Sequence, residues 1–178
     1  MERRSFPLRP APDPTVRFKG TYREAGWARA AAAGAADGVT YQMWDREDYP
    51  TWSLPALEAA KCAAAQGEEA FERVHFALFE AVFAKGCNIA VRDEVLAVVR
   101  DAGVDQGRFL QDFEAGRFRE DILREYQEAH ERYGITAIPT VIFDERVKIT
   151  GAVPRAEYER VLTEQFGLRP GTGRAGRG

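Results

Sequence analysis

A proline stands inside the most strand-like segment of this 178-residue chain and limits what that segment can become. Residues 135–143 are rich in β-branched and apolar side chains, which favours a buried strand. Pro139 lacks the backbone N–H that a central strand needs, so it fits only at an edge or where a strand begins. A cis Ile138–Pro139 peptide bond at the start of the strand satisfies both requirements. A turn at 144–146 and the alternating residues 147–150 then predict a β-hairpin.

The region before this segment has a helical period instead. Between residues 53 and 133, apolar side chains recur every three to four positions, and glycines separate the runs. Ser53 is a candidate N-cap, and Pro55 fits the first turn of the first helix. The expected helices end at or just before Gly67, Gly86, Gly103, Gly116 and Gly134.

The flanking regions complete an α/β pattern. Residues 3–8 predict a short strand with Phe6 and Leu8 on one face, and Pro7 restricts this strand to the edge of a sheet. The other expected elements are a helix at 21–36, an extended segment at 39–44, a helix ending at Gly167 and a disordered Gly/Arg tail at 168–178. This order predicts an α/β domain with a large helical insertion at about 53–133.

Charge and hydropathy exclude several classes of function. The net charge is −3, so nucleic-acid binding through bulk positive charge is not expected. No stretch approaches the roughly 20 apolar residues of a membrane-spanning helix. Residues 1–10 lack the apolar segment of a secretory signal, and two cysteines are too few for a disulfide scaffold. We therefore expect a cytoplasmic protein that binds neither nucleic acid nor membrane, with its oligomeric state left open.

The residues around Pro139 resemble a known superfamily. The run Gly134-Ile-Thr-Ala-Ile-Pro-Thr140, followed by a hydrophobic strand, a turn and Ile149-Thr-Gly-Ala152, is similar to the cis-proline region of the thioredoxin superfamily. With the helical insertion, it resembles the DsbA group, in particular the FrnE-like branch related to 2-hydroxychromene-2-carboxylate isomerases and kappa-class glutathione transferases. The resemblance implies a DsbA-like thioredoxin fold over residues 3–167.

The same resemblance implies a substrate-binding role for Ile138 and Pro139. In this superfamily, the backbone of the residue before the cis-proline pairs with an extended substrate, which is a form of strand addition. The implied activity is thiol-disulfide oxidoreduction. The implied partner is a protein thiol or disulfide, or a glutathione-like small molecule.

The chain departs from the family at the redox centre. Family members begin with a strand, a Cys-x-x-Cys at a helix N-terminus and that helix, whereas this sequence starts at what resembles the second strand and contains no Cys-x-x-Cys. Disulfide exchange needs a thiolate with a lowered pKa and a nearby resolving thiol. We therefore expect a thioredoxin-like fold that is incomplete at the N-terminus, in an N-terminally truncated and inactive chain with no catalytic residues and no cofactor.

The other candidate residues favour structural roles. Cys62 is expected in the core of a helix, and Cys87 in a loop. His75 lies on an apolar helix face and His130 on a charged one, while the acidic residues of 45–48 predict a solvated loop. The spacing of the histidines and cysteines matches no zinc pattern, so no metal site is expected.

Three functions remain open at this point. The first is a DsbA-family oxidoreductase whose catalytic N-terminus lies outside this sequence. The second is a glutathione-dependent isomerase or transferase that uses a serine at the same place. The third is a non-catalytic thioredoxin-fold interaction domain. In each case the absent first strand would lie at the centre of the sheet, so we expect residues 1–178 to fold poorly alone.

Overall fold

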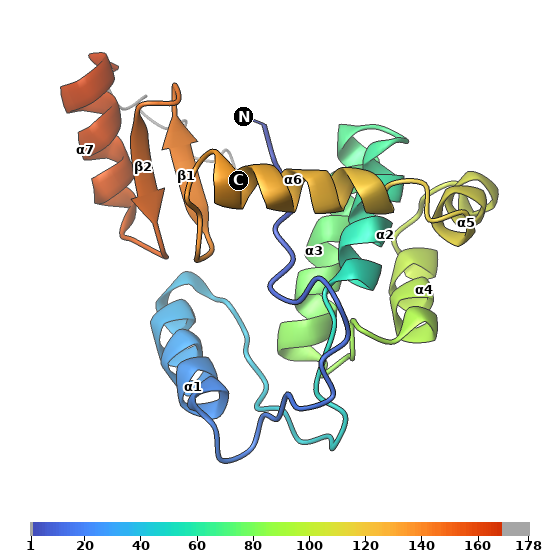
Figure 1. Cartoon of the computed structure of the whole chain (residues 1–178). Helices are drawn as coiled ribbons and strands as arrows, with labels where there is room; N and C mark the ends of the chain where they lie inside the picture. The colour runs from blue at the N-terminus through green and yellow to red at the C-terminus, as the bar shows by residue number, and fades with distance from the viewer. Residues whose placement is uncertain (1, 169–178) are drawn as a thin grey trace, which may run out of the picture. The chain divides into compact units, whose positions relative to one another are not determined.

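A computed structural model describes residues 2–168, which divide into two compact units, one ending at Glu128 and one beginning at Ala129. The predicted tail at 168–178 lies outside the described residues except for Leu168, which is exposed. In chain order the elements are α1 (Tyr22–Gly34), η1 (Ala35–Asp37), α2 (Leu54–Ala64), α3 (Glu68–Ala84), α4 (Arg92–Asp101), α5 (Gln106–Glu114), α6 (Arg119–Glu131), β1 (Thr140–Phe143), β2 (Val147–Thr150) and α7 (Arg155–Phe166) (Figure 1).

The apolar faces of α2, α3, α4 and α5 form the core of the first unit. Val74 of α3, Val95 and Val99 of α4 and Phe109 of α5 are fully buried against one another. Figure 1 shows α2 and α3 side by side, with α4 and α5 next to them. Burying a side chain of this size contributes about 1.5–3 kcal/mol. The helices within the predicted insertion therefore have a core of their own.

A second cluster, made of aromatic residues, attaches α1 and its flanking segments to α3. Phe18, Trp27 and Trp44 are buried together with Val82 of α3. The rings of Phe18 and Trp27 meet edge to face with centroids 5.5 Å apart. The indole N–H of Trp27 donates to the carbonyl of Gln42 at 2.9 Å. Because Trp27 is the buried residue of α1, this one side chain provides most of the attachment of that helix.

Residues 3–8 do not form the predicted edge strand, and they belong to no helix or strand. The backbone N–H of Ser5 donates to the carboxylate of Glu125 on α6 at 2.6 Å. The ring of Phe6 lies 5.1 Å from that of Tyr126, also on α6. A strand needs a neighbouring strand, and none lies beside this segment among the described residues. Side chains of α6 bind this segment instead, through the hydrogen bond to Ser5 and the ring contact with Phe6.

The second unit contains the predicted β-hairpin followed by α7. Strands β1 and β2 are antiparallel, with Val141 opposite Ile149. Helix α7 covers one face of the hairpin, where the ring of Phe143 lies 6.4 Å from that of Tyr158. Among the described residues of this unit, Ile149 and Val161 are buried and every other side chain is at least partly exposed. The second unit therefore has a very small core.

Candidate functional site

The loop that leads into β1 begins at the end of α6. Gly134 has a φ of +57°, in the left-handed region that glycine adopts without strain. Its N–H donates to the carbonyl of His130 at 3.1 Å, and the N–H of Ile135 donates to the carbonyl of Ala129 at 2.9 Å. These two bonds cap the last turn of the helix and redirect the chain toward Pro139.

The loop ends at the Ile138–Pro139 peptide bond, which is cis, the isomer that the sequence predicts. The carbonyl of Pro139 accepts a hydrogen bond from the N–H of Gly151 at 2.7 Å. The hydroxyl of Thr140 donates to the carbonyl of Ala137 at 2.7 Å. Ile138 is 45% exposed, and Pro139 is exposed too. Both predicted substrate-binding residues therefore lie on the surface, in a loop held by hydrogen bonds on each side of the proline.

The bond between Gly151 and Pro139 determines which backbone groups of β1 face β2. In an antiparallel pair, residues that exchange hydrogen bonds alternate with residues that do not. Pro139 is opposite Gly151 in the observed register, so Val141 and Phe143 are the next two residues whose N–H and C=O groups face β2. The N–H that Pro139 lacks would also have faced β2.

The other edge of β1 is open. The alternation places the backbone N–H and C=O groups of Thr140 and Ile142 on this edge. Within residues 2–168, the sheet contains two strands and nothing pairs with this side of β1. The open edge therefore presents two hydrogen-bonding positions, Thr140 and Ile142, directly after the cis-proline loop. Thr140 and Ile142 were not singled out by the sequence, because their role depends on the register.

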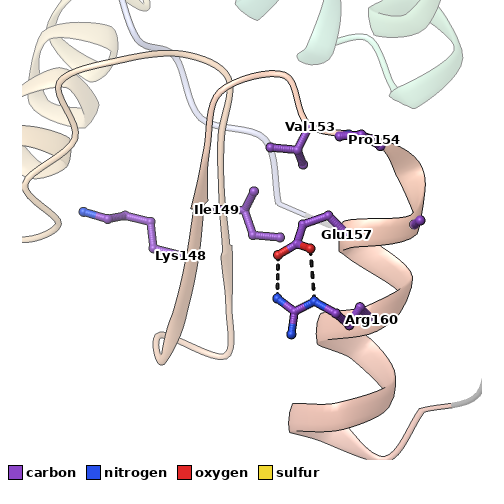
Figure 2. A pocket seen from close by; sticks show the side chains of 7 residues that line it. Lys148, Ile149, Val153, Pro154, Glu157 and Arg160 are labelled. Carbon is purple, nitrogen blue, oxygen red and sulfur yellow. Dashed lines mark hydrogen bonds and ion pairs between the residues drawn. The ribbon is translucent and has the colours of Figure 1, made fainter.

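A shallow hollow of 550 Å³ lies between β2 and α7. Figure 2 shows Ile149 directed toward α7 and Lys148 directed away from it, as alternation along a strand requires. Glu157 and Arg160 form a two-point ion pair across one turn of α7, at 2.6 and 3.0 Å. The residues that line the hollow include no thiol and no imidazole. The hollow is thus mainly apolar and offers no redox nucleophile.

The two cysteines, Cys62 and Cys87, are free thiols on different elements of the first unit. Burial raises the pKa of Cys62 to about 12, and the nearby carboxylate of Asp112 adds to the effect. Burial also raises the pKa of Cys87 to about 11, with a further contribution from its hydrogen bond to Glu94. A redox nucleophile needs the opposite shift, toward the thiolate. Both thiols are therefore protonated at neutral pH.

An ion-pair network joins the loop at 45–48 to α4. The guanidinium of Arg46 contacts Asp48 and Glu94, each at 2.7 Å. The side-chain amide of Asn88 donates to the carbonyl of Asp48 at 2.6 Å, and its backbone N–H donates to Glu94 at 2.7 Å. Arg46 holds the pKa of both carboxyls below their usual range. The predicted solvated loop is exposed at Asp48, yet this network anchors it.

The two histidines lie on helices α3 and α6. His75 lies between the rings of Phe71 and Phe79, with centroids 5.0 and 4.8 Å away. Burial lowers the pKa of His75, and the positive charge of Arg3 lowers it further. His130 is in the last turn of α6. In the described part of the chain, no group of three or more His, Cys, Asp or Glu side chains is placed to hold a metal ion.

With this geometry established, comparison with known families identifies the fold. A family model for the DSBA-like thioredoxin domain matches residues 47–163. The chain belongs to this family. The match includes the helices from α2 to α6, the cis-proline loop, the hairpin and most of α7. The fold is a thioredoxin-like DsbA fold with mostly helical content and a small two-stranded sheet within the described residues.

Two solved structures share this fold at low sequence identity. A probable DsbA oxidoreductase, SCO1869 from Streptomyces coelicolor, matches with a TM-score of 0.74 and 21% identity, over 94% of this chain and 75% of that one. A putative protein disulfide isomerase from Nitrosomonas europaea matches with a TM-score of 0.65 and 17% identity, over 79% of this chain and 72% of that one. These similarities establish the fold.

A curated relative is the ClpXP adapter protein SpxH of Halalkalibacterium halodurans, which is 28% identical over 134 residues. The match covers 72% of this chain but 43% of the relative, so the chain spans less than half of that protein. Among residues 2–168, no helix is both long and apolar enough to span a lipid bilayer.

Proposed function

We propose that this domain is the polypeptide-binding part of a DsbA-family thiol-disulfide oxidoreductase, and that residues 1–178 alone do not catalyse disulfide exchange. The observation that carries the proposal is the open edge of β1, which begins at the exposed Ile138–Pro139 loop. The oxidoreductase family and the DsbA-like solved structures support the choice of chemistry.

The open edge suits an extended polypeptide. Directly before this edge, Ile138 is exposed, and its backbone can pair with the backbone of a substrate strand. Backbone pairing of this kind does not depend on the side chains of the substrate. This pairing places one stretch of substrate against the cis-proline loop, which in the family lies beside the redox centre. The missing N–H of Pro139 does not weaken this pairing, because the backbone of Pro139 faces β2, where its carbonyl accepts a hydrogen bond from Gly151.

The thiols of this chain do not supply the redox chemistry. At pH 7, a thiol with a pKa of about 11 is ionised to about one part in 10⁴, so Cys87 is a poor nucleophile and Cys62 a worse one. They also belong to separate elements and show no disulfide. In the proposal, the Cys-x-x-Cys and the strand that would pair with Thr140 and Ile142 on the open edge of β1 belong to a polypeptide segment other than residues 1–178.

The coding sequence immediately upstream of the Met1 codon tests the proposal. An in-frame strand followed by Cys-x-x-Cys supports it. A serine in place of the first cysteine supports the alternative, a glutathione-dependent isomerase or transferase, which a glutathione titration of the extended protein would check. A stop codon directly upstream contradicts both.

A non-catalytic interaction domain is the second candidate. The observation that favours it is that the pKa values of both thiols are raised, which makes each a poor redox nucleophile, together with a relative whose name describes an adapter. A monodisperse protein with a cooperative melt but no disulfide-exchange activity would support this candidate over the oxidoreductase. We further propose a cytoplasmic location, where both thiols remain reduced.

A further inference from the structure

Helix α3 has an aromatic stripe beside its buried face. The rings of Phe71, His75, Phe79 and Phe83 recur every four residues, with successive centroids 5.0, 4.8 and 5.8 Å apart. The ring of Phe76 lies 5.6 Å from His75. Phe76 is 66% exposed and Phe79 is 49% exposed. Single exposed apolar residues are ordinary, but adjacent exposed aromatic rings mark a contact surface.

The N-terminal end of this stripe already binds an arginine from the chain itself. The guanidinium of Arg3 lies 5.1 Å over the ring of Phe71. It also forms ion pairs with Glu68 and with Glu72, the latter at 3.5 Å. An aromatic face combined with carboxylates from the same helix is a favourable environment for a guanidinium, through cation–π attraction and charge.

The same combination recurs farther along α3. Glu72, Phe76 and Glu80 follow one another at intervals of four residues, which places them in one row on the helix, and Phe79 lies beside that row. Among the described residues, no cation lies over the ring of Phe76 or Phe79. This second position is therefore an aromatic surface with carboxylates on both sides and no arginine over its rings.

The nearby basic groups leave this position accessible. Arg73 donates to the carbonyls of Ala102 and Gly103, at the end of α4. Lys85 pairs with Glu80 at 3.1 Å, but both side chains are more than half exposed, and such surface pairs exchange easily. Glu72 likewise pairs with Arg3 at 3.5 Å, and both of these side chains are exposed enough to exchange partners. The carboxylates of α3 (Glu68, Glu69, Glu72 and Glu80) outnumber the nearby cations (Arg3, Arg73 and Lys85), so the charge of this face is negative and complementary to a basic partner.

We infer that the surface formed by Glu72, Phe76, Phe79 and Glu80, the α3 patch, binds an arginine-containing apolar segment of a partner polypeptide. Arginine suits it better than lysine, because a planar guanidinium stacks on a ring while bonding a carboxylate, as Arg3 does on Phe71. The inference is independent of the proposed redox function, since the α3 patch lies on a different element from β1.

The test uses the full chain and a fluorescein-labelled nine-residue peptide of alternating arginine and leucine, followed by fluorescence anisotropy. We expect saturable binding. The Phe76→Ala/Phe79→Ala double variant should weaken it about tenfold. The Glu72→Gln/Glu80→Gln double variant should weaken it and reduce its dependence on salt. The matched control is Tyr22→Ala, which removes an exposed aromatic ring from α1 and should leave the affinity unchanged.

Three results would overturn the inference: no binding by the unmodified chain, equal binding of a peptide with glutamate in place of arginine, or unchanged affinity in both double variants. The glutamine variants change no apolar contact, so they remain informative if the alanine variant is less stable. A lysine peptide that binds as tightly as the arginine peptide would be a fourth such result, because it would contradict the stacking of a guanidinium on the rings.

Discussion

At the scale of single residues, the two thiols should differ in how fast they are alkylated. Iodoacetamide reacts with the thiolate, and pKa values of about 12 for Cys62 and about 11 for Cys87 leave little thiolate at pH 8. Cys62 is also 1% exposed, whereas Cys87 is half-buried. We expect Cys87 to be labelled faster than Cys62 in the folded chain, and both more slowly than in urea. Mass spectrometry of the labelled peptides measures both rates; rapid labelling of Cys62 in the folded chain would show that the α2 site is open.

His75 should titrate below an ordinary histidine. Burial is the main cause of its lowered pKa, Arg3 lowers the pKa further, and Glu72 raises it. Because the folded pKa lies below the unfolded value of about 6.5, the unfolded chain binds the proton more readily. His75 therefore costs no stability well above that pH, and destabilises the fold as the pH falls below about 6.5, until the folded-state pKa is passed. Arg3→Ala should raise the His75 pKa in an NMR titration, while the control Arg4→Ala should not; equal values in both variants would contradict the contact.

At the scale of elements, the open edge of β1 should appear in amide hydrogen exchange. The N–H groups of Val141 and Phe143 face β2, while those of Thr140 and Ile142 face the open edge. We expect protection to alternate along the strand, with Thr140 and Ile142 exchanging faster than their neighbours. NMR exchange rates check this. Equal protection of Thr140 and Val141 would mean that a further strand covers the edge.

The elements also differ in how far the sequence determined them. The stripe and flanking glycines of α3 predicted a helix at about 68–85, and the helix is Glu68–Ala84, because helical signals are local. The strand expected at 3–8 is absent, because a strand depends on a partner that lies elsewhere in the chain. The network around Arg46 was missed for the same reason, since Glu94 is 48 residues away.

The candidate site was only partly predictable. The proline before a β-branched run located the cis peptide bond and the exposed residues Ile138 and Pro139, because proline geometry is a property of the local sequence. The hydrogen-bonding positions at Thr140 and Ile142 follow from the strand register, which no local pattern specified. The raised thiol pKa values depend on burial and on neighbours from other helices, and therefore required the structure.

At the scale of the whole molecule, the two units should differ in stability. The first has a helical core with several fully buried side chains, whereas the described part of the second buries Ile149 and Val161. Burying two such side chains contributes about 1.5–3 kcal/mol each, against an ordering cost of about 1–2 kcal/mol for every backbone residue. We expect strong helical circular dichroism with a broad thermal transition. Tyrosine or NMR signals of the second unit should be lost before those of the first; a single sharp transition at both sets of probes would contradict this.

Disulfide exchange by the purified chain, followed as glutathione-driven reduction of insulin, shows directly whether residues 1–178 contain a redox centre. We expect a rate indistinguishable from the glutathione background for the unmodified chain and for the Cys62→Ser and Cys87→Ser variants alike, because neither thiol is ionised at neutral pH. Turnover above background that either substitution abolishes would contradict this expectation, and would make that cysteine the redox nucleophile of the domain.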